Sequence, residues 1–510
     1  MDRKTATIYR LMYLRLKSIE RYAKQSEAIQ TRQFKRILRV LRGTAYEQSL
    51  TSEPIRTYSD YQRIVPIVEY EELRPWVERM LQGERSQLIK GSCRWFATSS
   101  GTSGGRSKYL PVPGLHLQSC HYQGAKDALW LYLDTRPDSE FFAHKSLVIG
   151  GSHKPTEFAA GTHTGDLSAI LVENMPALGQ MYRVPSKQTL LMSEWTAKMR
   201  QIVREVATAD VGSLSGVPSW MLETIMAILE YTGRDNLSEV WPHLEVFFHG
   251  GISFDPYRER YRQVIPSERM QYRETYNASE GFFGVQDDPT SSSMLLMQDY
   301  GIFYEFIPMS QFDAPDRQAI PLADVQKGVN YALVISTLGG LYRYIIGDTV
   351  MFTELHPYKF IITGRTQSFI NAFGEELMVH NTTTAVSRVA QEMGVTVLDY
   401  TVAPRFCLET ANGYHEWIVE FETPPADSAH FIERIDQELR SLNSDYEAKR
   451  YADMALLMPR LVVARRGLFN DWLQEQGKLG GQHKIPRLRS TAELNDRLIE
   501  LNDRLIELNK

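Results

Sequence analysis

The feature that most constrains the fold of this chain is a short loop, rich in glycine and hydroxyl side chains, between two apolar runs. Residues 96–108 read FATSSGTSGGRSK, and a strand-like Lys-Tyr-Leu-Pro-Val run begins at Lys108. Glycine lets backbone N–H groups come close to a ligand, and hydroxyl groups donate hydrogen bonds to phosphate oxygens. The pattern predicts a strand–loop–strand unit that binds a polyanion, with the positive charge of Lys108 beside it. The predicted phosphate-binding residues are Ser99, Ser100, Gly101, Thr102 and Ser103.

The spacing of this loop differs from two common phosphate loops. A Walker A loop needs a glycine, four residues and then Gly-Lys-Ser/Thr, and a dinucleotide-binding loop reads G-x-G-x-x-G. Neither pattern occurs in residues 96–108. A flexible Ser/Gly linker is the alternative interpretation, although linkers seldom lie between two strand-like runs.

Composition narrows the class of protein. The chain has 510 residues, enough for more than one domain, and a formal net charge of −5 that weighs against a nucleic-acid partner. Cys93, Cys120 and Cys407 have no metal-type spacing, which favours reduced thiols over a disulfide framework. No apolar run reaches the roughly 18 residues of a membrane span, and the N-terminus lacks the apolar stretch of a signal peptide. We expect a cytoplasmic protein with no membrane span and no nucleic-acid partner.

Strand-like and helical patterns alternate along the chain, which predicts an α/β protein. The expected helices cover residues 70–80, 115–133, 195–207 and 221–231. The expected strands cover residues 146–151, 244–251, 270–276, 294–304, 331–338 and 416–422. A shorter unit of helices and strands begins near residue 375, so we place a domain boundary at Gly364, a plausible hinge. The two expected domains are residues 1–364 and 365–510.

Both ends of the chain have a helical pattern. Residues 1–42 are rich in arginine and lysine, which suits either a helix on a membrane surface or, the preferred interpretation, two amphipathic helices packed on the domain. Residues 494–507 consist of LNDRLIE repeated twice, with leucines at alternating steps of four and three. Two such heptads are too short to hold a coiled coil alone. A terminal helix docked on its own domain is preferred over a dimer zipper.

A second motif, Tyr276-Asn277-Ala278-Ser279-Glu280-Gly281, follows a strand-like run. Its aromatic ring suits stacking on a base, its hydroxyl suits phosphate, and its carboxylate suits Mg²⁺. Taken alone, the motif is explained equally well by a turn with an exposed glutamate.

A third motif, Tyr342-Arg343-Tyr344-Ile345-Ile346-Gly347-Asp348, places a carboxylate directly after a glycine. A carboxylate at the end of a strand can accept hydrogen bonds from both hydroxyls of a ribose. Arg343 can neutralise a phosphate or pair with Asp348. A structural ion pair at the strand end is the alternative.

The three motifs in this order resemble those of the auxin-responsive acyl acid amido synthetases, the Gretchen Hagen family of the adenylate-forming superfamily. The resemblance covers nearly the whole chain and is closer to the bacterial branch than to the plant hormone-conjugating enzymes. The further stretches that carry it are residues 65–71, 79–84, 216–220, 248–251, 364–366 and 481–487.

The resemblance implies a large N-terminal α/β domain with mixed sheets and helices, plus a small mobile α+β C-terminal domain. It also implies a two-step reaction. MgATP activates a carboxylic acid as an acyl-adenylate, with release of pyrophosphate. An amine, usually an amino acid, then displaces AMP to give an amide, after the C-terminal domain has rotated near residues 364–366.

The resemblance assigns roles to single residues. Glu280 would hold Mg²⁺, Tyr276 would cover the adenine, and Asp348 would bind the ribose. By position, Lys484 resembles the lysine that these enzymes swing in to neutralise the transition state; a solvated loop lysine is the alternative. The expected ATP- and AMP-binding residues also include Ser279 and Arg365.

The acyl acid is expected to lie among bulky side chains. His249 is either a general base for the incoming amine or, the preferred interpretation, part of the pocket lining. Ordinary core packing is the alternative for any one of the bulky residues. The candidates for the acyl pocket are Trp130, Val217, Trp220, His249 and Gly250.

Three functions fit these residues. The first is an amide-forming ligase that acts on a carboxylic acid and an amino acid, as a monomer or weak dimer. The second is a thioester-forming ligase that uses coenzyme A or a carrier protein. The third is a non-catalytic ATP-dependent scaffold, which the presence of all three nucleotide motifs disfavours.

Overall fold

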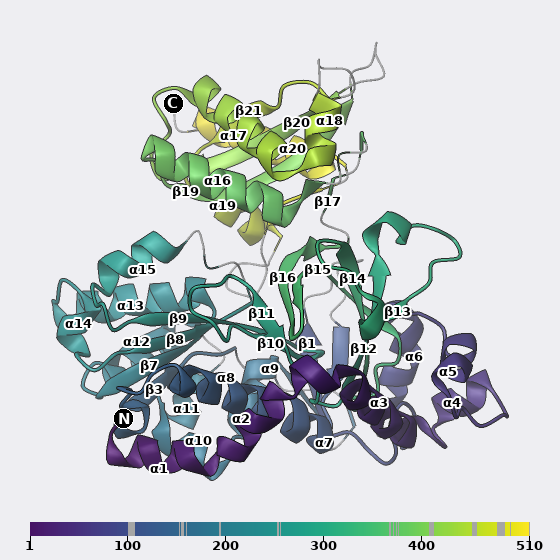
Figure 1. Cartoon of the computed structure of the whole chain (residues 1–510). Helices are drawn as coiled ribbons and strands as arrows, with labels where there is room; N and C mark the ends of the chain where they lie inside the picture. The colour runs from purple at the N-terminus through teal and green to yellow at the C-terminus, as the bar shows by residue number, and fades with distance from the viewer. Residues whose placement is uncertain are drawn as a thin grey trace. The chain divides into compact units, whose positions relative to one another are not determined.

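A computed structural model describes most of the chain (Figure 1). The described residues are 1–99, 108–151, 153–154, 158–159, 161–192, 195–251, 254, 257–366, 369–370, 372–373, 375, 377–406, 413–450, 456–476, 485–489 and 491–508. The chain forms two compact units. The first comprises residues 1–346 and 351–361, and the second comprises residues 347–350 and 362–510.

The N-terminal unit is built on a sheet of twelve described strands in the order β13-β12-β14-β15-β16-β11-β10-β9-β8-β7-β3-β6. At one side of this sheet, neighbouring strands run parallel, as an α/β pattern requires. These parallel strands are β3 (Lys145–Val148), β6 (Arg183–Val184), β7 (Val211–Gly216), β8 (Val246–His249) and β9 (Gln271–Ala278).

Helices cover both faces of the parallel region. Strand β8 shows why, because its apolar side chains alternate between two core clusters. Phe247 packs in one cluster, with residues of the helices α12 (Trp195–Val206), α13 (Pro218–Thr232) and α15 (Arg258–Val264). Val246 packs in the other, with residues of α2 (Tyr13–Glu20) and α8 (Tyr122–Asp134). Shorter helices of this unit are α9 (Leu167–Glu173), α10 (Ala177–Tyr182), α11 (Lys187–Leu190) and α14 (Leu237–Val240).

The rest of the sheet is largely antiparallel. Its strands are β10 (Gly281–Val285), β11 (Met294–Leu296), β12 (Ile302–Pro308), β13 (Ile320–Pro321), β14 (Asn330–Thr337), β15 (Tyr344–Leu355) and β16 (Tyr358–Arg365). The prediction of one strand over residues 294–304 is wrong. Gly301, with φ of 76°, forms a turn that separates β11 from β12.

A second, smaller sheet has the order β2-β1-β5-β4. Strands β1 (Trp95–Ser99) and β2 (Lys108–Pro111) are antiparallel, and Ser99 lies opposite Lys108 in the register. The other two strands are β4 (His153–Lys154) and β5 (His163–Gly165). The glycine- and hydroxyl-rich segment therefore joins two paired strands, as the apolar runs on either side of it predicted.

The N-terminal residues form helices that pack on their own unit. Arg15 is largely buried, and its guanidinium forms ion pairs with two carboxylates. One is Asp127, whose side chain has no solvent exposure, and the other is Asp299, whose Oδ2 lies 2.6 Å from Arg15 Nη1. No helix among the described residues is both long and apolar enough to cross a membrane. These helices are α1 (Arg3–Leu11), α2, α3 (Tyr22–Leu41), α4 (Ala45–Leu50), α5 (Tyr58–Ile64) and α6 (Tyr70–Leu81).

The C-terminal unit has a sheet of three described strands, β19 (Val397–Phe406), β20 (Gly413–Phe421) and β21 (Arg460–Ala464), and a small pair, β17 (Phe369–Ile370) and β18 (Leu377–Met378). Figure 1 shows its helices beside these strands. They are α16 (Val379–Met393), α17 (Ser428–Leu442), α18 (Ser444–Arg450), α19 (Leu468–Glu475) and α20 (Glu493–Leu508).

The duplicated tail forms helix α20, and it docks on its own unit. Leu494, Leu498 and Leu501 are buried in one core cluster with residues of α19. Asn495 and Asn502 occupy the same place in the two repeats, and each bonds a group of the unit: the Asn495 amide donates to the Glu416 carbonyl, and the Arg465 N–H donates to Asn502. The first repeat and the start of the second are therefore used inside the C-terminal unit.

Candidate nucleotide and acyl site

The carboxyl ends of the parallel strands form one edge of the sheet in the N-terminal unit. Ile149-Gly150-Gly151 follows β3, Val217 follows β7, and Gly250-Gly251 follows β8. Strand β9 extends beyond its pairing with β8 and carries Tyr276 to the turn at Ser279-Glu280. Ligands of open α/β sheets bind outside this edge. Four strands thus bring two glycine pairs, Val217 and the second motif together at this edge.

Glycine is needed at Gly250 because the backbone of β9 lies against it. A Cβ at this position would lie 2.3 Å from the carbonyl oxygen of Thr275, which is too close for any side chain. The Thr275 hydroxyl donates to the His249 carbonyl at 3.1 Å and closes the same contact. A Cβ at Gly251 would meet the Val217 side chain at 3.6 Å, so the β7 and β8 turns are also adjacent.

The second motif is more buried than a simple exposed turn. Glu280 is only 9% exposed, which does not fit the alternative of an exposed glutamate. The Tyr276 ring is also buried, with its centroid 4.8 Å from that of Phe283 and 6.2 Å from that of Phe360. Since ring packing fixes Tyr276 in the core, only a small part of the ring is open to a base.

Three neighbouring side chains form hydrogen bonds to this turn and to the strands on either side of it. The His116 Nε2 bonds the Glu280 carbonyl at 3.1 Å, and the His121 Nδ1 bonds Asn277 Oδ1 at 3.0 Å. The Phe282 N–H donates to Cys120 Sγ at 3.1 Å. These residues lie in and beside η1 (Leu117–His121), one turn of π-helix between α7 (Gly114–His116) and α8. Such turns are frequent at functional sites. The motifs of the sequence do not indicate this contact.

Burial keeps these histidines neutral. It lowers the pKa of His116 to about 3 and the pKa of His121 to about 4, because a buried imidazolium loses its hydration. In each histidine the bonded ring nitrogen faces an acceptor oxygen, so that nitrogen carries the hydrogen and donates it. The β9–β10 turn is therefore held by two neutral imidazoles with assigned tautomers.

We expect the free energy of unfolding to fall with pH below the ordinary histidine pKa of about 6.5. Between about pH 6.5 and 4 the unfolded chain binds a proton at His121 that the folded chain does not. Each such histidine costs about 1.4 kcal/mol per pH unit in this window. The variant His121→Asn should make the decline of unfolding free energy between pH 7 and 5 shallower by that amount, measured by urea unfolding. The matched control is His430→Asn, on an exposed histidine; equal slopes in both variants would contradict the expectation.

Lys198 is a second buried group that the motifs of the sequence do not indicate. Its side chain is almost fully buried on α12, and Nζ donates to the carbonyls of Gly150 at 2.7 Å and Gly151 at 3.1 Å. Burial lowers the pKa of Lys198 to about 8, and the charge of Asp166 opposes this shift. The lysine thereby fixes the turn after β3 at the edge where the site lies. In the sequence, the only sign of this turn is the pair of glycines, Gly150 and Gly151, after β3.

The predicted phosphate loop is described only at its two ends. Ser99 ends β1 and Lys108 begins β2, with the Lys108 ammonium 5.7 Å from the centre of the Tyr70 ring. The other predicted loop residues, Ser100, Gly101, Thr102 and Ser103, lie outside the described residues, as does Lys484.

The third motif divides into two parts with different surroundings. Asp348 pairs with Arg365, whose Nε lies 3.3 Å from Oδ1, in the C-terminal unit. Arg343, in contrast, is buried and forms an ion pair with Glu305. Neither of the roles considered for Arg343, neutralising a phosphate or pairing with Asp348, fits this position. The partner of Asp348 is Arg365, the residue after Gly364, because it lies on the adjacent strand β16.

The acyl-pocket candidates do not all lie together. Val217, His249 and Gly250 lie at the carboxyl edge. Trp220, on α13, is partly buried and packs against the core cluster that contains Phe247. Trp130 lies elsewhere, in the core cluster that includes Leu16 and Phe142. Its position there follows from the apolar face of α8, which the pattern alone did not orient.

His249 is poorly suited to act as a general base. Its ring is buried and stacks on that of Phe254, with centroids 4.3 Å apart. Burial, aided by the charge of Arg258, lowers the pKa of His249 to about 3. A base with so low a pKa takes up a proton weakly at neutral pH, so the position favours pocket lining.

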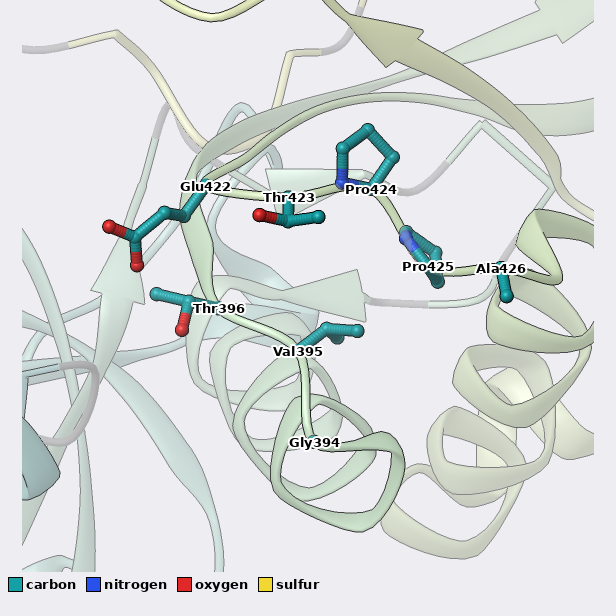
Figure 2. A pocket seen from close by; sticks show the side chains of 8 residues that line it. All are labelled: Gly394, Val395, Thr396, Glu422, Thr423, Pro424, Pro425 and Ala426. Atoms are coloured by element: carbon teal, nitrogen blue, oxygen red, sulfur yellow. The ribbon is translucent and has the colours of Figure 1, made fainter.

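A small pocket in the C-terminal unit contains none of these candidates. It has a volume of about 240 Å³ and lies between the loop that ends α16 and the loop that ends β20. Figure 2 shows its lining, which is Gly394, Val395, Thr396, Glu422, Thr423, Pro424, Pro425 and Ala426. With a single ionisable side chain, the pocket offers no set of converging polar groups that would define a ligand.

Solved structures show which known fold this chain has. The chain is similar to a GH3.15 acyl acid amido synthetase, with a TM-score of 0.74, 18% identity and coverage of 96% of this chain and 95% of the other. It is also similar to a 2-hydroxyisobutyryl-CoA ligase in its postadenylation state, with a TM-score of 0.60, 13% identity and coverage of 94% and 93%. The fold is that of the adenylate-forming enzymes.

Family models identify the branch of that class. The GH3 family N-terminal domain matches residues 15–270, the central domain matches residues 295–365, and the C-terminal domain matches residues 380–493. Since the first match alone spans half of the chain, this chain belongs to the GH3 family.

Two relatives from Arabidopsis thaliana align over most of their length. An indole-3-acetic acid-amido synthetase, GH3.3, is 23% identical, with 95% of this chain and 93% of the relative covered. A 4-substituted benzoates-glutamate ligase, GH3.12, is 22% identical, with 84% and 87% covered. The family resemblance inferred from the three motifs is confirmed.

Proposed function

We propose that this protein is an ATP-dependent acyl acid amido synthetase. It converts a carboxylic acid and ATP to an acyl-adenylate and pyrophosphate, and then transfers the acyl group to an amine, an amino acid, with release of AMP. The observation that supports this function most is the buried Glu280 turn at the carboxyl edge of the sheet, in a chain of the GH3 family. The names of the relatives support the same reaction.

The chemistry explains the choice of residues. A carboxylate that attacks the α-phosphate of ATP is an anion approaching an anion, so the site must supply positive charge and alignment. Ser99 to Ser103 and Lys108 hold the phosphates, and Lys484 neutralises the charge of the transition state. Glu280 offers the carboxylate oxygen that a hard cation such as Mg²⁺ prefers, and Mg²⁺ held there would supply further positive charge. Tyr276 and Ser279 complete the nucleotide site.

The substrate and its surroundings are assigned by position. Val217, Trp220, His249 and Gly250 form the acyl pocket, without Trp130. Residues 1–364 bind ATP and the acid, and residues 365–510 form the cap, whose rotation near Gly364 separates the two half-reactions. Cys93 and Cys120 are free, buried thiols, which supports a cytoplasmic location. The internal docking of α20 supports a monomer.

The product distinguishes this function from thioester formation, which the CoA ligase fold makes the second candidate. The protein is incubated with MgATP, a panel of aromatic, indolyl and fatty acids, and either amino acids or coenzyme A, and products are identified by mass spectrometry. We expect an acyl–amino acid amide and AMP. A thioester with coenzyme A, and no amide with any amino acid, would contradict the proposal.

Asp348 is expected to contribute to nucleotide affinity through the ribose hydroxyls. The variant Asp348→Ala removes both acceptor oxygens, and we expect the Kd for ATP to rise at least about tenfold, since hydrogen bonds to a charged group contribute about 1.5–3 kcal/mol. Calorimetric titration with ATP measures the change. The matched control is Glu433→Ala, which removes an exposed carboxylate elsewhere in the C-terminal unit and should leave the Kd for ATP unchanged. An unchanged ATP affinity in Asp348→Ala would contradict the ribose assignment.

A further inference from the structure

At the opposite end of the same parallel strands, three side chains converge that the proposed reaction does not use. His144 precedes β3, Asp210 precedes β7, and His243 lies just before β8. The Nδ1 of His144 lies 2.7 Å from one oxygen of the Asp210 carboxylate, and the Nδ1 of His243 lies 3.0 Å from the other. One possible ligand atom from each residue lies within 4.8 Å of the other two.

The backbone of the sheet holds these side chains in place. The Lys145 N–H donates to the Asp210 carbonyl at 2.8 Å, and the Glu245 N–H donates to the Gly212 carbonyl at 2.9 Å. A Cβ at Gly212 would lie 2.8 Å from the Cβ of His144. The glycine therefore leaves the room that the His144 ring occupies. The starts of three neighbouring strands therefore fix the three residues, and no metal ion is needed to hold them in place.

The geometry is close to that of a metal site. In tetrahedral zinc sites, Zn–N and Zn–O bonds of about 2.0–2.2 Å place neighbouring ligand atoms about 3.3 Å apart. The three possible ligand atoms lie within 4.8 Å of one another, so a bound ion would draw them together toward this separation. The imidazole rings are stacked, with centroids 4.3 Å apart and planes at 11°, and each Nδ1 lies beside an oxygen of the same carboxylate. Two imidazoles and one carboxylate suit a borderline cation such as Zn²⁺ rather than Mg²⁺ or Ca²⁺.

We propose that His144, Asp210 and His243 bind a divalent first-row transition-metal ion, of which Zn²⁺ is the representative. The His144 side chain is 10% exposed and anchors the site, while those of Asp210 and His243 are 56% and 45% exposed. This exposure leaves a fourth position to water and gives the ion direct access. The bound ion ties three loops together at the edge of the sheet remote from the nucleotide turn.

A second His-Cys-His group, formed by His116, Cys120 and His121, is a weaker candidate. Each of its members already bonds the β9–β10 turn, and all are fully buried. A metal ion there would have to break the contacts that hold the turn. This group serves instead as the control.

The test is zinc binding by the full chain without a histidine tag, freed of metal with a chelator. Zn²⁺ is titrated in competition with a chromophoric chelator, and Co²⁺ is used to report the ligands by its visible absorption. We expect one tight Zn²⁺ per chain. Because Asp210 and His243 are half-exposed, Asp210→Asn and His243→Gln should keep the fold, checked by circular dichroism, and weaken binding at least about tenfold.

The controls are His430→Gln, which changes an exposed histidine of the C-terminal unit, and Cys120→Ser. Both should bind Zn²⁺ like the parent chain, and the Co²⁺ complex should lack thiolate absorption. Zn²⁺ should also raise the Tm of the parent chain but not that of His243→Gln. The proposal is overturned by failure to bind Zn²⁺, by undiminished binding in Asp210→Asn and His243→Gln, or by loss of the tight ion in Cys120→Ser.

Discussion

Replacing Glu280 with glutamine is expected to slow acyl-adenylate formation by about a hundredfold or more, because charge-stabilising contacts of this kind contribute several kcal/mol to a transition state. Glutamine keeps the size of the side chain and leaves the Glu280 carbonyl free to bond His116. The fold of the turn should therefore survive, and the loss should appear as a lower kcat. The rate of pyrophosphate release at saturating ATP and acid measures it.

The matched control for this prediction is Glu354→Gln, which neutralises an exposed carboxylate on β15 of the same unit. We expect its rate to equal that of the parent enzyme. If raised Mg²⁺ concentrations partly restore Glu280→Gln, the carboxylate acts through the cation. A parent-like rate in Glu280→Gln would remove Glu280 from the catalytic machinery.

Replacing Glu305 with leucine is expected to destabilise the N-terminal unit by about 3–5 kcal/mol, because it leaves a buried guanidinium without its counter-charge. Glu305 is fully buried, and both of its oxygens accept from Arg343 Nε, at 3.2 and 3.1 Å. The same guanidinium donates to the carbonyls of Gln62 and Val65, so it joins β12 to the end of α5. Thermal unfolding by calorimetry should show the loss as a lower Tm for this unit.

Two comparisons make this prediction specific. The double variant Glu305→Leu/Arg343→Leu should be less destabilised than Glu305→Leu, since no unpaired charge stays buried. The control Glu259→Gln breaks an exposed ion pair with Arg262 and should change the stability by less than about 1 kcal/mol. A loss in Glu305→Leu no larger than in this control would contradict the structural role of the pair.

Much of the fold could be predicted from local pattern. The apolar runs that end in glycine became β3 and β8, because a buried parallel strand is apolar throughout and its turn needs glycine. The α/β class was also predicted correctly from the alternation of patterns, and the family from three short motifs and the stretches that accompany them. The prediction of one strand over residues 294–304 is wrong at Gly301, because an apolar run does not show where the backbone turns inside it.

The surroundings of the site could not be predicted in the same way. Lys198 and His121 contact the turns only through the packing of helices far away in sequence. Likewise, the partner of Arg343 is Glu305, 38 residues away in the chain, and no spacing rule links them. Trp130 was assigned to the pocket on its size alone, while the face of α8 on which it lies sends it into a core cluster.

The central claim is that this chain activates a carboxylic acid as an adenylate. Acid-dependent exchange of labelled pyrophosphate into ATP, with Mg²⁺ and a panel of aromatic, indolyl and fatty acids, tests it most directly. We expect exchange that requires an acid, saturates with it, and falls at least about a hundredfold in Glu280→Gln. Measurable ATP binding with no acid-dependent exchange across the panel would contradict the claim.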